Sequence, residues 1–441
     1  MIEKLKKACC FDFDKKEAYG QIRVIESRWD GEDHVEITAE ISLINSDMLN
    51  LELQSVEDNP LLYFYEFLGE AKINSEKYTI EYIAQLLDLY TWRKSHGMVK
   101  VTIYTEEEFK KYQNEDNIFC FYGETLFAES RVATKNSVIV IEHPIDNKEL
   151  FYLSDILYRE IIKNSITSTI DIIYRLNDIF NEEIQTVQID IYNVAQASFN
   201  NCVINNNKSI LFDIGVTRSK CDIMSTEIQA ALYKISKLLI NGVILSHWDL
   251  DHILGAAYTH STATHCTWIA PDFRNLYKTD KYPLSVLRLC NYLSKNGCLC
   301  LIDTSQTKKH FYTSSDNKVN IWLGDPVISN GINKANNGGL LLNIENEKSI
   351  LLTGDCENNV HPAGLYKKAL DYIVIPHHGS IMSPPKARGT DNSTAYVSYG
   401  KKRGHCSLDR DLRKKYKRHN FSNLCRTKNL SVTQVKYTVT L

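Results

Sequence analysis

The stretch of sequence that decides the fold is VILSHWDLDHILG, at residues 243–255. Its apolar start is typical of a buried strand, and four polar side chains follow within six residues: His247, Asp249, Asp251 and His252. Buried carboxylates repel one another and are costly unless a cation or protons compensate their charge. Imidazole nitrogens beside carboxylate oxygens suit a divalent transition metal. The pattern therefore predicts a metal-binding loop directly after a strand, with a merely polar loop as the alternative.

The composition indicates a globular protein of two domains. The chain has 441 residues, of which 43% are hydrophobic and 24% are charged. Its net charge of −3 excludes a nucleic-acid binder that is basic overall, although a local basic patch remains open. The twelve cysteines form no C-x-x-C pair, the N-terminus has no apolar signal-peptide core, and no stretch approaches about 18 apolar residues. We therefore expect a cytoplasmic protein with free thiols and no membrane-spanning helix.

Residues 1–180 are expected to form an α+β domain of unknown role. Alternating runs such as HVEITAEISLI, within residues 20–56, predict a hairpin or meander. Further strands are expected at 99–105 and 137–143, and helices at 78–94, 105–113 and 151–180. We find no catalytic constellation in this half, and a contact with a protein partner through it is left open.

Residues 185–441 are expected to form a second domain. It opens with VQIDIYNVAQASFNNCVINNNKSILFDIG, which predicts three short strands separated by Asn-rich turns. Asp213 and Gly215 end the third of these strands. An amphipathic helix at 223–240 and the strand that begins at Val243 follow, so the order is strand, strand, helix, strand.

Segments across residues 188–412 resemble, in the same order, those of metallo-β-lactamase-fold hydrolases, in particular the hydrolase domain of ComEC-type DNA-uptake proteins. The loop at 247–252 resembles the H-x-H-x-D-H motif, with Asp249 in place of the second His. NVAQASFNNCVI resembles a V-G-Q-G-D segment, with Ala195 and Ala197 in place of both glycines. The other three similar segments are ANNGGLLLNIENEKSILLTGDC (335–356), DYIVIPHHGS (371–380) and AYVSYGKKRGHCSLDRDL (395–412). The resemblance implies a metallo-β-lactamase αββα sandwich.

The resemblance also implies two metal ions and their ligands. The first ion would be held by His247, Asp249 and Asp355, and the second by Asp251, His252, Asp355 and His405. The His that the family usually has before the bridging Asp is absent, and Asn336 or Asn337 occupies that region. Because oxygen ligands favour harder ions, the first set suits Mn²⁺ or Mg²⁺, whereas the second suits Zn²⁺ or Mn²⁺.

The resemblance further implies the catalytic roles. Asp251 and Asp355 would orient the attacking water, and a His of the pair His377 and His378 would donate a proton to the leaving oxygen. We favour His378 as the proton donor, although direct ligation of a metal by this residue remains an alternative. A Lys that ComEC-type proteins have before this pair is missing, and Val374 stands there instead.

A strongly basic segment covers residues 401–428 of an otherwise slightly acidic chain. It begins beside His405, so it is expected near the metals. The candidate contacts to a substrate phosphate are Lys414, Lys415 and Lys417. A solvated helix face is the alternative interpretation.

Together these patterns favour a metal-dependent hydrolase with two divalent ions, and specifically a phosphodiesterase or nuclease that acts on DNA or RNA. One alternative is the hydrolysis of a cyclic or modified small nucleotide. Another is a non-catalytic binding module with a degraded metal site. The fold by itself serves many reactions and does not decide between these functions.

Overall fold

The computed structural model describes six strands of the N-terminal part and most of the chain after residue 160. The described ranges are 17–29, 34–44, 66–74, 98–105, 120–126, 137–144, 161–217, 225–259, 261–272, 284–305, 309–327, 334–380, 382–399 and 411–441. The chain divides into two compact units, one of residues 1–159 with 279–289 and the other of residues 160–278 with 290–441. The predicted domain boundary at 180–185 stays a prediction.

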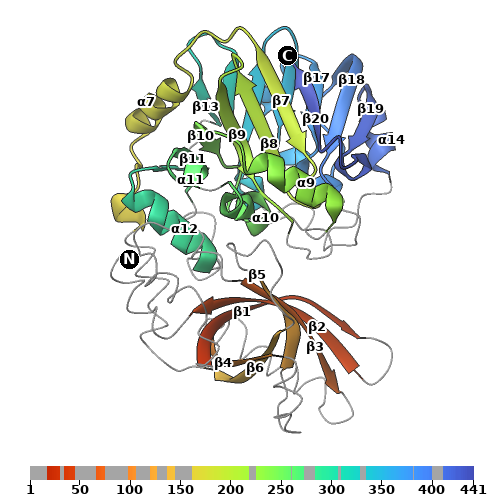
Figure 1. Cartoon of the computed structure of the whole chain (residues 1–441). Coiled ribbons are helices and arrows are strands. Elements are labelled where there is room, and N and C mark those ends of the chain that lie inside the picture. The colour runs from red at the N-terminus through yellow and green to blue at the C-terminus, as the bar shows by residue number, and fades with distance from the viewer. Residues whose placement is uncertain are drawn as a thin grey trace. The chain divides into compact units, whose positions relative to one another are not determined.

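The N-terminal unit contains a closed barrel of antiparallel strands (Figure 1). In chain order its strands are β1 (Glu17–Trp29), β2 (His34–Ile44), β3 (Glu66–Asn74), β4 (Met98–Thr105), β5 (Cys120–Leu126) and β6 (Ser137–Pro144). They pair in the order β1-β2-β3-β5-β6-β4, and closure leaves no edge strand open for pairing. The predicted hairpin is β1 with β2, and the two further predicted strands are β4 and β6. The helices expected at 78–94 and 105–113 lie outside the described residues, apart from Thr105 itself, so the α+β character stays a prediction.

The first sheet of the C-terminal unit has seven strands in the order β12-β11-β10-β9-β8-β7-β20. Their bounds are β7 (Val187–Tyr192), β8 (Phe199–Ile204), β9 (Lys208–Ile214), β10 (Gly242–Ile244), β11 (Thr267–Pro271), β12 (Leu299–Ile302) and β20 (Lys436–Thr440). Strands β9 to β12 are parallel, whereas β7, β8 and β20 pair antiparallel. The predicted Asn-rich hairpin turn joins β8 to β9, and Asn205 and Asn206 both have positive φ there.

The second sheet also has seven strands, in the order β13-β14-β15-β16-β17-β18-β19. Their bounds are β13 (His310–Thr313), β14 (Val319–Leu323), β15 (Leu340–Glu345), β16 (Ser349–Leu352), β17 (Leu370–Val374), β18 (Gly389–Val397) and β19 (Phe421–Arg426). The first four strands are antiparallel, and β16 to β19 are parallel. Two mixed sheets of this kind are consistent with a metallo-β-lactamase sandwich.

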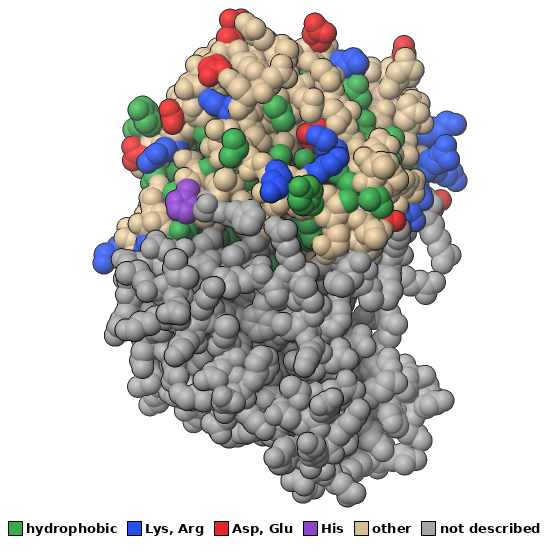
Figure 2. Space-filling model, viewed as in Figure 1, with side chains coloured by type: hydrophobic (Ala, Val, Ile, Leu, Met, Phe, Trp, Pro, Cys, Tyr) green, Lys and Arg blue, Asp and Glu red, His purple; other side chains and the backbone are tan. Residues whose placement is uncertain are grey.

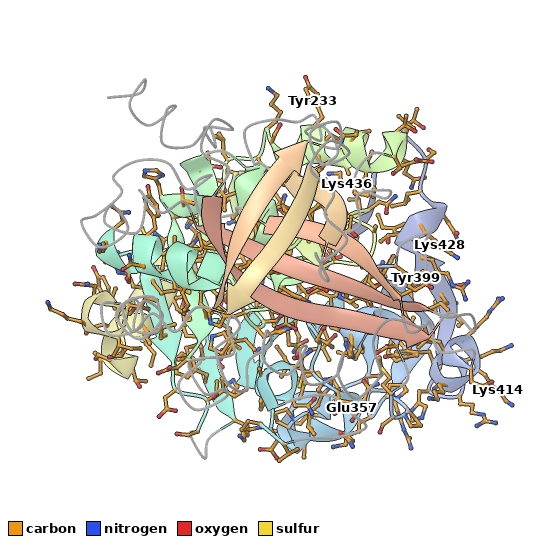
Figure 3. All side chains as sticks on the ribbon, turned by 90° about the horizontal axis from the view of Figure 1, so that it is seen from below. Tyr233, Glu357, Tyr399, Lys414, Lys428 and Lys436 are labelled. Atoms are coloured by element: carbon orange, nitrogen blue, oxygen red, sulfur yellow. The ribbon has the colours of Figure 1, made fainter. Side chains whose placement is uncertain are left out.

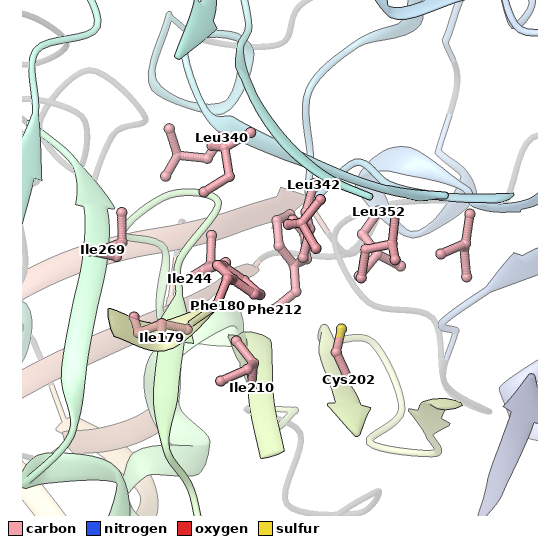
Figure 4. Close-up of a cluster of buried hydrophobic side chains, with 14 of the residues drawn as sticks. Ile179, Phe180, Cys202, Ile210, Phe212, Ile244, Ile269, Leu340, Leu342 and Leu352 are labelled. Atoms are coloured by element: carbon pink, nitrogen blue, oxygen red, sulfur yellow. The ribbon is translucent and has the colours of Figure 1, made fainter. Parts of the chain in front are cut away.

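The two sheets share one apolar core (Figure 4). Phe212 and Ile244 of the first sheet belong to the same buried cluster as Leu342 and Leu352 of the second. Strand β15 contributes to both sides of its sheet, because Leu341 belongs to a separate buried cluster while Leu340, Leu342 and Ile344 belong to the shared core. Each such buried Leu or Ile contributes about 1.5–3 kcal/mol relative to an exposed one. The core therefore fixes both sheets before any polar site residue is considered.

Two of the expected helices bury an apolar stripe. The C-terminal part of the helix expected at 151–180 is α7, which buries Ile172, Leu176 and Ile179, and the helix expected at 223–240 is α9, which Ser225 caps. The bounds are α7 (Thr169–Ile179), α9 (Thr226–Ile235), α10 (Leu250–Ile253), α11 (Ser261–Thr264), α12 (Leu284–Lys295), α13 (Lys334–Asn337) and α14 (Leu412–Lys417), with a short 3-10 helix η7 (Pro376–Gly379). Among the described helices, none has both the length and the apolar character that a membrane crossing needs.

Candidate metal centre

The loop after β10 leaves the first sheet where the polar residues begin. The backbone N–H of Leu245 still donates to Ile269 of β11, at 2.8 Å, and α10 begins after Asp249. The path of this loop is fixed by close packing against the end of β9. A Cβ at Gly215 would lie 1.6 Å from the backbone oxygen of Asp251, so only glycine fits there. The loop residues His247 and His252 are fully buried.

Asp355 reaches this loop from the second sheet, just after β16. Gly354 precedes it with φ +53°, a conformation that L residues rarely adopt. A Cβ at Gly354 would lie 2.3 Å from the Cβ of Ser246. The glycine therefore both turns the chain and lets Asp355 come close to the loop of the opposite sheet.

The two carboxylate oxygens of Asp355 face two different groups of side chains. Oδ2 lies 3.8 Å from Nε2 of His247 and 3.7 Å from Nε2 of His377. Oδ1 lies 3.2 Å from Nε2 of His252 and 3.7 Å from Nε2 of His378. Asp355 thus stands between two candidate positions for a cation.

The carboxylates of the loop complete these two positions. Oδ2 of Asp249 lies 3.5 Å from Nε2 of His247, on the first side. Oδ2 of Asp251 lies 3.3 Å from Nε2 of His378, on the second side. Ligand atoms within 4.8 Å of one another come from two overlapping groups: His247, His252 and Asp355, and Asp251, His252 and His378. The structure therefore brings together seven of the side chains singled out from the sequence.

The pair His377 and His378 has an unusual backbone conformation in η7. Both residues are left-handed, with φ of 49° and 52°, and Gly379 follows with φ 75°. For non-glycine residues this conformation costs about 1–2 kcal/mol each. The N–H of His377 donates to the oxygen of Gly354, at 3.1 Å, which ties the pair to the turn before Asp355. The strain directs the two adjacent imidazoles to the two sides of Asp355.

Asp213 and Ser246 orient the histidines from behind, a role that was not predicted from the sequence. Oδ2 of Asp213 lies 2.8 Å from Nδ1 of His252 and accepts a hydrogen bond from Oγ of Ser246 at 3.0 Å. That Oγ lies 3.0 Å from Nδ1 of His247. Because Nδ1 of both rings is engaged, Nε2 of each ring is left for the cluster. The only sequence signal for Asp213 was a polar residue at the end of an apolar strand.

The donor atoms of the cluster fit a bound cation. Nε2 of His247, His252 and His378 and Oδ1 of Asp355 are buried, and none makes a well-directed hydrogen bond. Burial lowers the pKa of His252, but the carboxylates of Asp213 and Asp355 outweigh it and raise this pKa well above its usual range. Burial raises the pKa of Asp355, but the imidazoles of His252, His378 and His377 hold it well below its usual range. Both shifts arise from buried carboxylate charge, which is the charge that a divalent cation would compensate.

The remaining candidate residues lie elsewhere. His405 is outside the described residues. Lys414 and Lys417 lie exposed on α14, and Figure 3 shows Lys414 pointing away from the sandwich. Lys415 differs from them, because its Nζ donates to the backbone oxygen of Met382 at 2.6 Å. One of the three predicted phosphate contacts is therefore engaged in holding the segment that follows η7.

The chain matches no protein-family profile and no curated protein sequence. Among solved structures it is similar to a mutant of the CmlA beta-hydroxylase, with 11% identity over 77% of this chain and 75% of that chain and a TM-score of 0.34. It is similar to a diphosphatase from the PhnP family, with 10% identity over 59% and 99% of the two chains and a TM-score of 0.33. It is also similar to a long form of RNase Z from yeast, with 10% identity over 72% and 50% and a TM-score of 0.29. The function therefore has to be argued from the site itself.

Proposed function

We propose that this protein is a metal-dependent hydrolase that cleaves phosphodiester bonds of DNA or RNA. The observation that carries the proposal is the position of Asp355, whose two oxygens each face a separate pair of imidazoles. Two divalent ions bound there would lower the pKa of an attacking water and neutralise charge on the phosphoryl group. The resemblance of the sequence to ComEC-type hydrolases supports the same reaction class.

The two sides of the site differ in the ligands that they offer. With His377 set aside for the role proposed below, the first side has one imidazole and two carboxylates: His247, Asp249 and Asp355. Oxygen ligands favour Mn²⁺ or Mg²⁺ there. The second side has Asp251, His252, Asp355 and His378, with His405 as a further candidate, and this set suits Zn²⁺ or Mn²⁺.

The geometry favours separate roles for the two adjacent histidines, instead of the role of proton donor for His378. The side chain of His378 is 4% exposed and lies beside Asp251, which favours ligation of the second ion. The side chain of His377 is 20% exposed, so a substrate could reach it. We therefore propose His377 as the proton donor to the leaving oxygen, and Asp251, whose side chain is 21% exposed, as a residue that orients the attacking water.

The substrate proposal depends on the basic surface around α14. Arg413, Lys414, Lys417 and Arg418 are exposed, and Figure 2 shows Lys and Arg side chains gathered where α14 lies. Such a surface attracts the phosphate backbone of a nucleic acid. A cyclic or modified nucleotide would need only the metal site. A cytoplasmic location and a protein partner for residues 1–180 stay predictions.

Metal content and activity of three variants test the proposal. Asp355→Ala should lose both ions and all activity. His378→Ala should lose about one equivalent of metal, whereas His377→Ala should keep both equivalents and lose about 10²–10⁴-fold in rate. Elemental analysis and hydrolysis of a chromogenic phosphodiester measure the two quantities. Wild-type protein with substoichiometric metal would instead indicate a degraded site used for binding.

A further inference from the structure

A buried amide lies beside the first side of the metal centre. Asn336 is in α13 and is 4% exposed. Its Nδ2 donates to Oδ2 of Asp355 at 3.4 Å. This is the carboxylate oxygen that also faces His247 and His377, at 3.8 and 3.7 Å. The Asn336 amide therefore contacts Asp355 at the oxygen that faces the first side of the centre.

The neighbouring Asn337 makes other contacts. It is fully buried, its Oδ1 accepts from the N–H of Glu357 at 3.0 Å, and its Nδ2 donates to the oxygen of Val327 at 2.6 Å. These contacts join three backbone segments and include no candidate ligand. Of the two asparagines at the place of the family's missing His, Asn336 is the one whose amide donates to Asp355.

The chemistry of an amide differs from that of an imidazole at this place. The amide N–H holds Oδ2 of Asp355 in a fixed direction and leaves the carboxylate charged. An imidazole would add a nitrogen ligand, which favours Zn²⁺ over harder ions. Asp249 is another place on this side where the chain lacks the nitrogen ligand that the family has.

We infer that Asn336 is a positioning residue that fixes Asp355 for the first ion, and that it makes this position prefer Mn²⁺ to Zn²⁺. The inference rests on the proposed function, because it presupposes that the centre binds metal. It predicts a change in ion preference, which a purely structural amide would not produce.

The test compares Asn336→Ala and Asn336→His with Asn343→Ala in the full-length chain. Asn343 is an equally buried asparagine on β15 whose Nδ2 donates to Glu345, at 2.9 Å. Each protein is stripped with a chelator, checked for its melting temperature, and titrated with Mn²⁺ by electron paramagnetic resonance and with Zn²⁺ by competition. Asn336→Ala should weaken binding of the first Mn²⁺ about 10–100-fold, whereas Asn343→Ala should not. Asn336→His should shift the ratio of the two affinities toward Zn²⁺ about tenfold or more.

Unchanged Mn²⁺ affinity in Asn336→Ala, or an equal loss in Asn343→Ala, would overturn the inference while leaving the proposed function intact. An Asn336→His variant with the same ratio of Mn²⁺ to Zn²⁺ affinity as the wild type would overturn the inference as well. Wild-type protein that binds neither ion would overturn the proposed function itself. The two failures are therefore distinguishable within one set of titrations.

Discussion

At the scale of single residues, Asp213 determines how His252 faces the metal centre. It is fully buried and contacts both Nδ1 of His252 and the backbone N–H of Ser246, at 2.8 and 2.7 Å. Carboxylate partners of this kind orient a ligating imidazole and make it more basic. Asp213→Asn should therefore weaken metal binding about 10–100-fold while the protein still folds.

Equilibrium dialysis at limiting metal measures this effect. The matched control is Asp190→Asn, which removes the charge of another buried aspartate, on β7, whose partners include Lys436, Thr438 and Gln188. Equal metal affinity in the Asp213 variant and the wild type would refute the orienting role.

Ala195 has a backbone conformation that suits glycine. Its φ is 59°, and it stands where the V-G-Q-G-D segment has its first glycine. The left-handed region costs an L residue about 1–2 kcal/mol. A glycine removes this cost, and the stability that it loses by giving the unfolded chain more conformational entropy is smaller. Ala195→Gly should therefore raise the free energy of unfolding by about 0.5–1 kcal/mol. Urea unfolding checks the gain, and Ala197→Gly, at a buried position without positive φ, should instead destabilise the protein.

At the scale of elements, α14 carries a basic surface and also contacts the segment that follows η7. Lys414 and Lys417 are exposed, whereas Lys415 holds the backbone of Met382. Replacing the two exposed lysines by Ala should flatten the salt dependence of binding to a long single strand. The expected change in slope is about 1.4, because each phosphate contact contributes roughly 0.7 for a single strand. Hydrolysis of a small chromogenic phosphodiester should stay nearly unchanged.

The control for this double variant is Lys234→Ala with Lys237→Ala, which removes the same charge from exposed positions at the end of α9. An equal flattening of the salt dependence in the control would mean that the total charge of the protein determines binding and that the position of α14 does not. Lys415→Ala should act differently from both, because it releases the segment after η7 and should slow hydrolysis of the small substrate as well.

Much of the candidate site could be predicted because its polar side chains follow strand ends. His247 and Asp355 each come within three residues of an apolar run, and the apolar runs became β10 and β16. The contact between Asp213 and Ser246 could not be predicted, because the two residues are 33 positions apart and meet only when β9 and β10 pair. The left-handed conformation of His377 and His378 was equally hidden, since non-glycine residues rarely adopt it. The closed order of the barrel strands depends on contacts between distant segments, which alternation within each strand does not encode.

At the scale of the whole molecule, the buried His361 makes stability depend on pH. Burial lowers its pKa to about 4, while its contact with the backbone oxygen of Cys356, at 2.9 Å, and nearby Glu357 oppose this shift and Lys386 adds to it. The unfolded chain therefore binds a proton between about pH 6.5 and 4 that the folded chain does not bind. Stability should fall as the pH drops through this window, by up to roughly 3 kcal/mol.

Urea unfolding at several pH values between 7 and about 4 measures this contribution. His361→Gln removes the titrating group and should flatten the curve in that window, whereas replacing the exposed His310 in the same way should not. A curve for the His361 variant that is parallel to that of the wild type would assign the pH dependence to other groups.

The candidate metal centre takes its side chains from both sheets, so its parts leave the ribosome at different times. The loop of His247 and His252 belongs to the first sheet, whereas Asp355 and His378 follow strands of the second. Domains fold as units while the chain grows from its N-terminus. A nascent chain that ends before Asp355 carries the histidines of the first-sheet loop without the carboxylate that faces them. The candidate ligands therefore meet only after strands of both sheets have been synthesised and have folded.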